Sequence, residues 1–177
     1  GLLGAVDPAE RVLCVEDAHE LDPVHPHVVS LLARGANVEG VGEVTVRDLV
    51  RQALRMRPDR IVVGEVRGAE VVDLLTALNT GHDGGAGTVH ANSPREVPAR
   101  LEALAALGGL GREALHAQLA AAFQVVFAVH RWPSGRRGLR SIGVVDRGDD
   151  GYVRVLPVWD REGGFTAEAE RVQVLLA

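Results

Sequence analysis

The expected fold of this chain is set by one stretch, residues 57–94, which reads RPDRIVVGEVRGAEVVDLLTALNTGHDGGAGTVHANSP. An apolar run at residues 60–66 predicts a strand, and its successive Ile and Val residues are typical of a strand that is covered on both faces. Residues 69–80 carry the apolar periodicity of a helix. A glycine-rich loop, residues 84–87, then leads to a short predicted strand at residues 88–91. This order predicts a strand–helix–strand unit of a parallel sheet.

The same alternation continues on both sides of this stretch. Short apolar runs predict strands at residues 11–16 and 28–32, and Thr45 with Asp48 has the spacing of a capping box at the start of a helix. The other predicted helices cover residues 45–57, 93–107 and 111–122, and the last predicted strands cover residues 124–131, 139–146 and 152–159. We therefore expect an α/β fold, in which a parallel sheet with helices is followed by a small antiparallel β segment.

Composition narrows the class of protein. The chain has 177 residues, a formal net charge of −5 and one cysteine, Cys14. The acidic balance argues against a broad electrostatic surface for nucleic acid, so no direct nucleic-acid partner is expected. No apolar run reaches the ~20 residues that span a bilayer, and no signal peptide is visible. A lone cysteine fits a reducing compartment, so we expect a cytoplasmic protein.

The first residues read like the end of a helix. The chain starts with Gly, residues 1–6 have helical character, and Asp7-Pro8 then predicts a turn before the first strand. We therefore expect a piece of a longer protein. All 19 basic residues are arginine, so this chain has no lysine with which to build a phosphate-binding loop of the G-x-x-x-x-G-K-[ST] type.

Acidic side chains follow two of the predicted parallel strands. Glu65 comes at the end of an apolar strand, which would hold its carboxylate rigidly beside magnesium and its waters. Glu16, Asp17 and Glu20 follow the first strand, where an acid can orient or deprotonate an attacking water. Ligands of open α/β sheets bind beyond the carboxyl ends of the strands, where these residues and His90 are expected. The alternative for each acid is an ordinary solvated carboxylate at a strand end.

Two histidines flank the glycine-rich loop. His82 and His90 can each donate a hydrogen bond to a phosphate oxygen. A metal site of His82, Asp83 and His90 is a rival interpretation, although the spacing matches no familiar ligand pattern. A metal-dependent hydrolase that uses both histidines with Glu65 is a further alternative. One buried and one surface histidine would explain the same sequence without any ligand.

Arginines crowd the helix predicted over residues 45–57. Arg47, Arg51 and Arg55 recur every four residues and therefore share one helix face. Arginine suits phosphate recognition and fingers that act on a neighbouring subunit. A solvated basic face paired with nearby acids explains such a row equally well. We favour that second interpretation for Arg51 and leave both open for Arg55.

In combination, these motifs resemble those of the secretion ATPases of type II and type IV systems, most closely the branch that assembles tight-adherence (Tad/Flp) pili. VEDAHEL at residues 15–21 resembles the family's aspartate box. The helix and atypical Walker B box are matched by RDLVRQALRMRPDRIVVGEVRG at residues 47–68. TGHDG at residues 80–84 and TVHANS at residues 88–93 resemble the histidine box.

The resemblance implies an incomplete RecA-like P-loop core that works in a homohexamer and binds ATP and Mg²⁺. Such rings turn ATP hydrolysis into work on inner-membrane platform proteins, so the protein would be held peripherally at the inner membrane through its partners. The implied division is a partial ATPase core at residues 1–146 and a C-terminal β-rich extension at residues 147–177.

The resemblance also implies roles for single residues. Glu65 would hold magnesium through water, Glu16 would activate the attacking water, and Glu20 would support it. The residues implied to contact or surround the nucleotide are His82, His90, Arg55 and Arg67. Without the phosphate-binding loop, we expect this polypeptide by itself to be inactive and to bind ATP weakly or not at all. A DNA-conjugation motor and a non-catalytic docking module remain alternatives.

Overall fold

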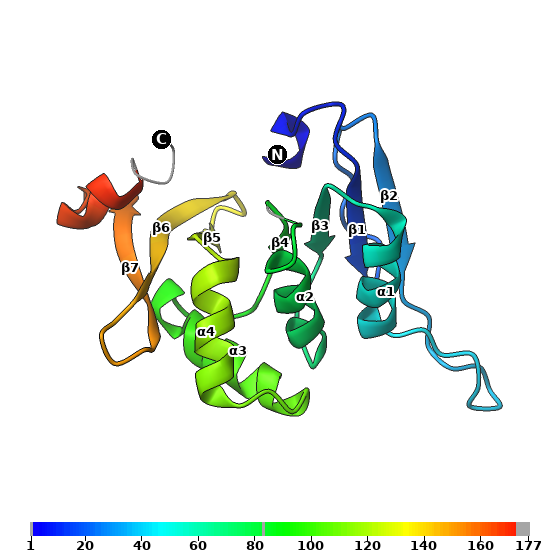
Figure 1. Cartoon of the computed structure of the whole chain (residues 1–177). Coiled ribbons are helices and arrows are strands. Elements are labelled where there is room, and N and C mark those ends of the chain that lie inside the picture. Colours follow the sequence, from blue (N-terminus) through cyan, green and yellow to red (C-terminus); the bar gives the residue numbers. More distant parts are fainter. Residues whose placement is uncertain (1, 83, 173–177) are drawn as a thin grey trace. The chain divides into compact units, whose positions relative to one another are not determined.

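The computed structural model describes residues 2–82 and 84–172 (Figure 1). Its contacts divide the chain into two compact units, one of residues 1–89 with 104–109, the other of residues 90–103 with 110–177. Each unit contains its own four-stranded sheet. The parallel sheet precedes the antiparallel one along the chain, as the sequence predicts.

The sheet of the first unit has parallel strands in the order β2-β1-β3-β4. The strands are β1 (Val12–Glu16), β2 (Val28–Leu32), β3 (Arg60–Val63) and β4 (Ala86–Gly87). β1 lies inside the sheet and is buried along its whole length, which agrees with its continuous apolar sequence. The register pairs Val15 with Val63, so the carboxyl ends of β1 and β3 lie side by side.

Two helices pack beside each other on this sheet: α1 (Val46–Ala53), which continues as the 3-10 turn η2 (Leu54–Met56), and α2 (Glu70–Leu78). A cluster of Val12, Cys14 and Val62 is covered by partly buried side chains of Leu3, Val6, Leu21 and Val28. Leu3 belongs to a short helical turn, η1 (Leu2–Ala5). Burial, and then the charge of Glu16, raises the pKa of the Cys14 thiol, so Cys14 is a neutral core residue.

The capping box predicted at the start of α1 is present. The Thr45 side chain accepts the Asp48 N–H at 3.1 Å, and Asp48 Oδ2 accepts the Thr45 N–H at 3.1 Å. Thr45→Ala removes one half of this reciprocal pair and is expected to lower the free energy of unfolding by about 1 kcal/mol. Urea unfolding measures the loss. Thr76→Ala, an exposed position within α2, is the control, and an equal effect of both substitutions would contradict the capping role.

The second unit combines helices with an antiparallel sheet. Its helical segments are η3 (Pro94–Glu96), α3 (Val97–Leu107, whose last residues belong to the first unit), α4 (Arg112–Ala122) and η4 (Ala167–Ala169). Its strands, in the order β5-β6-β7-β8, are β5 (Val125–Arg131), β6 (Arg137–Arg147), β7 (Val153–Asp160) and β8 (Gly164–Phe165). This sheet begins upstream of residue 146, and the functional division at that residue stays a prediction. Among the described residues, no helix is long and apolar enough to cross a bilayer.

Three predicted elements were wrong in detail. β3 ends at Val63 rather than at Val66, and β4 covers Ala86–Gly87 rather than residues 88–91. A Cβ on Gly85 would lie 2.8 Å from the Ile61 carbonyl oxygen, so only glycine lets this segment come close enough to pair with β3. His90 is therefore not on a strand. Ser93 precedes η3 but makes no capping bond with its side chain.

Candidate functional site

Glu16 is the buried acid of the carboxyl edge of the sheet. It is the last residue of β1, and only 2% of it is exposed. Its Oε1 accepts the backbone N–H groups of Glu20 at 3.0 Å and Leu21 at 2.9 Å. The carboxylate thereby fixes the loop that follows β1. Hydrogen bonds of this kind satisfy one carboxylate oxygen in a place that water hardly reaches.

Gly64 makes room for this carboxylate. Its N–H donates to the Val15 carbonyl at 2.8 Å, so it continues the pairing of β3 with β1. A Cβ at Gly64 would lie 2.7 Å from Cγ of Glu16 and 3.1 Å from its Oε1. A larger residue here would push Glu16 out of position. Gly64 is therefore a positioning residue for Glu16, which sequence analysis missed.

The second carboxylate oxygen of Glu16 has no hydrogen bond. Oε2 is buried and has no hydrogen-bond partner within the described chain, although Nδ1 of the exposed His19 lies at ion-pair distance, 3.7 Å away. A buried charged oxygen is costly unless it is paired. The described residues contain no group of three His, Cys, Asp or Glu side chains that could hold a metal ion alone. A carboxylate oxygen such as Glu16 Oε2 is of the donor type that magnesium and its bound waters accept.

Glu65, which is partly buried, and Arg67, which is exposed, lie at the same edge. Arg67 donates to Glu65 Oε2 and, at 3.0 Å, to Asp17 Oδ2. It therefore joins the segment after β3 to the segment after β1. The hydrogen bond to Glu65, then the charges of Asp17 and Glu65, raise the pKa of the Arg67 guanidinium further above its usual range. The Glu65 side chain is 18% exposed and is held in this pair at the surface of the edge.

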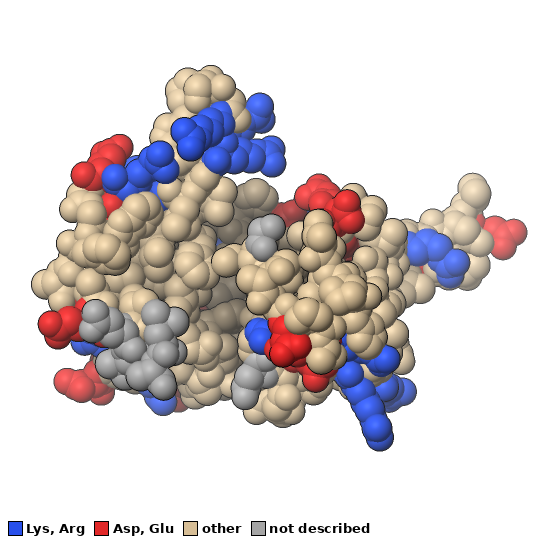
Figure 2. Space-filling model, turned by 90° about the horizontal axis from the view of Figure 1, so that it is seen from above, with Lys and Arg blue, Asp and Glu red and all other residues tan. Residues whose placement is uncertain are grey.

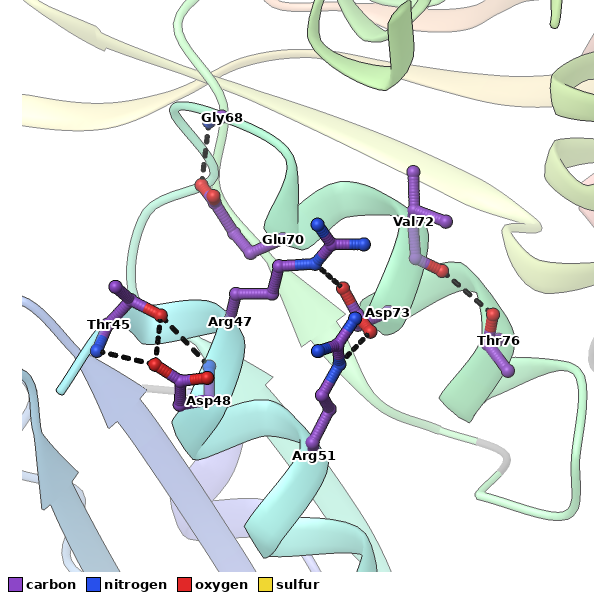
Figure 3. A network of polar contacts seen from close by, with 9 residues as sticks. All are labelled: Thr45, Arg47, Asp48, Arg51, Gly68, Glu70, Val72, Asp73 and Thr76. Carbon is purple, nitrogen blue, oxygen red and sulfur yellow. Dashed lines mark hydrogen bonds and ion pairs between the residues drawn. The ribbon is translucent and has the colours of Figure 1, made fainter. Parts of the chain in front are cut away.

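Glu70 shapes the turn between β3 and α2. Its Oε1 accepts the backbone N–H group of Arg67 at 2.6 Å. The same oxygen accepts the backbone N–H group of Gly68 at 2.7 Å (Figure 3). An acid in the first turn also suits the positive end of a helix. This side chain holds the backbone from which Arg67 projects, and sequence analysis did not single it out. The sequence signal for Glu70 was its position, two residues after the glycine that follows Arg67.

The arginine row of α1 is largely structural. Asp73 of α2 accepts from Arg47 Nε at 2.6 Å and from Arg51 Nε at 2.7 Å (Figure 3). The two arginines therefore join α1 to α2, as favoured for Arg51. Arg55 lies in η2, next to Met56, whose carbonyl accepts from Arg11 Nη1 at 2.6 Å. Arg11 immediately precedes β1, so Arg55 lies at the amino edge of the sheet, opposite Glu16.

His82 also lies at the amino edge. Its Nδ1 is 3.3 Å from the Ala77 carbonyl of α2. Two residues later, the Gly84 carbonyl accepts from Arg60 Nη1 at 3.2 Å, and Arg60 is the first residue of β3. The structure therefore does not bring His82 and Glu65 together. Asp83, the third member of the rival metal site, lies outside the described residues.

The remaining predicted site residues are placed separately. Glu20 is exposed, and its backbone N–H rather than its carboxylate contacts Glu16. His90 is exposed and begins the second unit. The structure thus gathers Glu16, Asp17, Glu65 and Arg67 at one edge of the first unit. Of the other predicted residues of that unit, Glu20 follows β1, whereas Arg55 and His82 lie at the opposite edge.

Comparison with known proteins agrees with this architecture. A family model described as "Type II/IV secretion system protein" matches residues 1–132. "Putative conjugal transfer protein MT3759" of Mycobacterium tuberculosis is 67% identical over 99% of this chain and 49% of its own length. "Type IV secretion system protein PtlH" of Bordetella pertussis is 44% identical over 52% of this chain and 27% of its own length.

A solved structure shares the fold. The VirB11 ATPase from the Brucella suis type IV secretion system, in complex with sulphate, aligns with a TM-score of 0.66 and 27% identity over 81% of this chain and 44% of that chain. This confirms the RecA-like fold class. The chain spans about half the length, or less, of the relatives it matches. On its motifs, its parallel sheet and these matches, the chain belongs to the type II/IV secretion system protein family.

Proposed function

We propose that this chain belongs to an ATPase that powers a type II or type IV secretion or pilus-assembly machine. Its catalytic residues would lie at the carboxyl edge of the parallel sheet. The observation that supports this most is Glu16, a buried carboxylate with one oxygen held by two N–H groups and the other without a hydrogen bond. Such an acid is held rigidly and keeps one oxygen free of hydrogen bonds, which suits the activation of a water molecule.

Magnesium would be held at this edge through water, with Glu65 as the outer carboxylate. When bound, the ion would neutralise charge that develops on the phosphates. Arg67 keeps Glu65 in place and also pairs with the negatively charged Asp17. Glu20 would support Glu16 by donating its backbone N–H group to the Glu16 carboxylate. His90 as a sensor of the terminal phosphate, and Arg55 and His82 at the amino edge, stay predictions from the resemblance.

Glu65→Gln in the complete gene product is expected to lower Mg²⁺-dependent ATP hydrolysis by about 10- to 100-fold, the usual effect of removing an outer-shell ligand. Phosphate release at several Mg²⁺ concentrations measures the change. Raised Mg²⁺ should recover part of the rate. Glu113→Gln, an exposed acid on α4, is the matched control. Unchanged hydrolysis and Mg²⁺ dependence in Glu65→Gln would contradict the proposal and favour a non-catalytic docking module.

The proposed assembly is a homohexamer in the cytoplasm, attached to inner-membrane platform proteins, without direct contact to nucleic acid. Its membrane attachment would be peripheral and would run through those partners. The resemblance to the tight-adherence branch supports a pilus as the assembled structure.

A second candidate cargo is a conjugating DNA complex, because a relative with 67% identity is named as a conjugal transfer protein. Deleting the gene in its host distinguishes the two candidates. Loss of surface pili with unchanged DNA transfer would support pilus assembly. Loss of transfer with intact pili would support conjugation.

A further inference from the structure

The loop between β2 and α1, residues 33–44, projects from the first unit and is exposed from residue 34 to residue 43; it is called the arm below. Arg34 and Val44 close its base by two backbone hydrogen bonds of 2.9 and 2.8 Å. At its tip, Asn37 Oδ1 accepts the N–H groups of Glu39 and Val41, both at 3.0 Å. Figure 1 shows the arm extending away from the sheet.

The arm exposes apolar and acidic side chains together. Every residue from Arg34 to Glu43 is exposed, and Val38 at the tip is fully accessible. Val41 is also exposed, and Glu39 and Glu43 add two negative charges. Ordering a loop costs conformational entropy that burial normally offsets. Burial of Val38 and Val41 against a partner would provide such an offset.

A surface of the opposite character lies on the β5–β6 hairpin, residues 125–145, called the ribbon below. It contains four exposed arginines and no acid: Arg131, Arg136, Arg137 and Arg140. The described chain records no ion pair for any of them, whereas Arg47, Arg60 and Arg67 are paired. Figure 2 shows several arginines gathered where the surface projects.

The ribbon also exposes apolar side chains beside its arginines. Phe127, Val129 and Arg131 alternate with more buried neighbours along β5, so they share one face of the strand. Val129 is 70% exposed. In the cross-strand register, Arg131 faces Arg137 and Val129 faces Leu139. One face of the ribbon therefore combines a basic end with an apolar patch.

We propose that the arm of one copy of this chain docks on the ribbon of a second copy. Val38 and Val41 would cover the apolar patch, and Glu39 and Glu43 would meet the arginines. The inference rests on the proposed function only for its assembly of several copies. The two surfaces are different parts of the chain, so the contact is heterologous and generates a ring if the rotation closes. An anionic membrane or a nucleic acid would explain the ribbon's charge but not the arm.

Disulfide trapping tests the contact directly. A tagged Val38→Cys protein and an untagged Val129→Cys protein are mixed under mild oxidation, without nucleotide. The only native cysteine, Cys14, is buried, so mixed dimers would report the engineered pair. We expect a tagged–untagged dimer in this mixture and not in a mixture of Val38→Cys with Ala117→Cys, an exposed position on α4. Equal trapping in both mixtures, or none in either, would overturn the proposal.

Charge reversal gives an independent measurement. Glu39→Arg with Glu43→Arg, or Arg131→Glu with Arg137→Glu, should each weaken self-association in sedimentation by about tenfold or more, through like-charge contacts. Mixing the two double variants should restore it, since opposite charges then face each other. The proposal would be wrong if the mixture did not recover self-association. It would also be wrong if the arginine variants lost only vesicle or DNA binding. None of these readouts depends on ATP hydrolysis, so failure here and failure of the proposed ATPase are distinguishable.

Discussion

Glu16→Gln in the complete gene product is expected to lower ATP hydrolysis by about 10²- to 10⁴-fold, the range of a lost general base. Glutamine has nearly the shape of glutamate, and its carbonyl oxygen can accept the same N–H groups of Glu20 and Leu21. Its NH₂ group would occupy the place of Oε2, which has no hydrogen bond to lose. The fold is therefore retained while the proton acceptor is removed.

The assay should separate chemistry from binding and folding. Steady-state phosphate release gives kcat, fluorescence of a labelled nucleotide gives affinity, and circular dichroism with thermal unfolding reports the fold. We expect kcat to fall, nucleotide affinity to stay within a few-fold, and unfolding to be unchanged. Glu113→Gln on α4 removes the same charge far along the sequence and should keep kcat. A Glu16→Gln protein that hydrolyses ATP at nearly the parental rate would rule out Glu16 as the base.

The first parallel strands and helices could be read from sequence because their signals are local. The apolar run before Glu16 predicts β1, and the Thr45–Asp48 box fixes the start of α1 to the residue. β4 could not be placed this way. Its pairing depends on how closely Gly85 approaches Ile61, a distance that arises only when α2 and β3 are both in place.

The positions of the candidate site residues were predicted in part for a similar reason. The carboxyl ends of parallel strands share one edge, so Glu16 and Glu65 were correctly expected together. His82 was assigned to the phosphate because it flanks the glycine-rich loop and because of the family resemblance, not because it follows a strand. α2 carries the chain back along the sheet, however, and leaves His82 near the start of β3. The contact of Gly64 with Glu16 joins residues 48 positions apart in sequence and needs the β1–β3 register.

His116→Ala is expected to lower the free energy of unfolding of the second unit by about 3–5 kcal/mol, since it combines a buried cavity with a stranded hydrogen-bond donor. His116 is 2% exposed on α4. Its Nδ1 accepts the Val153 N–H at 2.9 Å, and its Nε2 lies 2.8 Å from Glu102 Oε1. The backbone donor requires Nδ1 to be unprotonated, so Nε2 carries the hydrogen and donates it to Glu102. One imidazole thus joins α3, α4 and β7.

Urea unfolding of the parental protein, His116→Ala and His116→Phe separates the two contributions. Phenylalanine refills most of the volume but leaves the Val153 N–H without an acceptor, so it should recover part of the loss and not all of it. Glu113→Ala on the exposed side of α4 is the control for helix propensity. Full recovery in His116→Phe would show that only packing matters at this position.

The acid limb of the stability curve provides the sharper test of the His116–Glu102 bond. The hydrogen bond from His116, and then that from Arg112, lower the pKa of the Glu102 carboxyl below its usual range. A carboxyl whose pKa is lower in the folded state contributes stability that is present above the unfolded value of about 4.3 and is lost as pH falls through the folded value. The parental protein should therefore lose stability below about pH 4 more steeply than His116→Phe, in which the pKa of Glu102 returns toward normal. Parallel acid limbs in the two proteins would show that His116 fills space without holding the carboxylate.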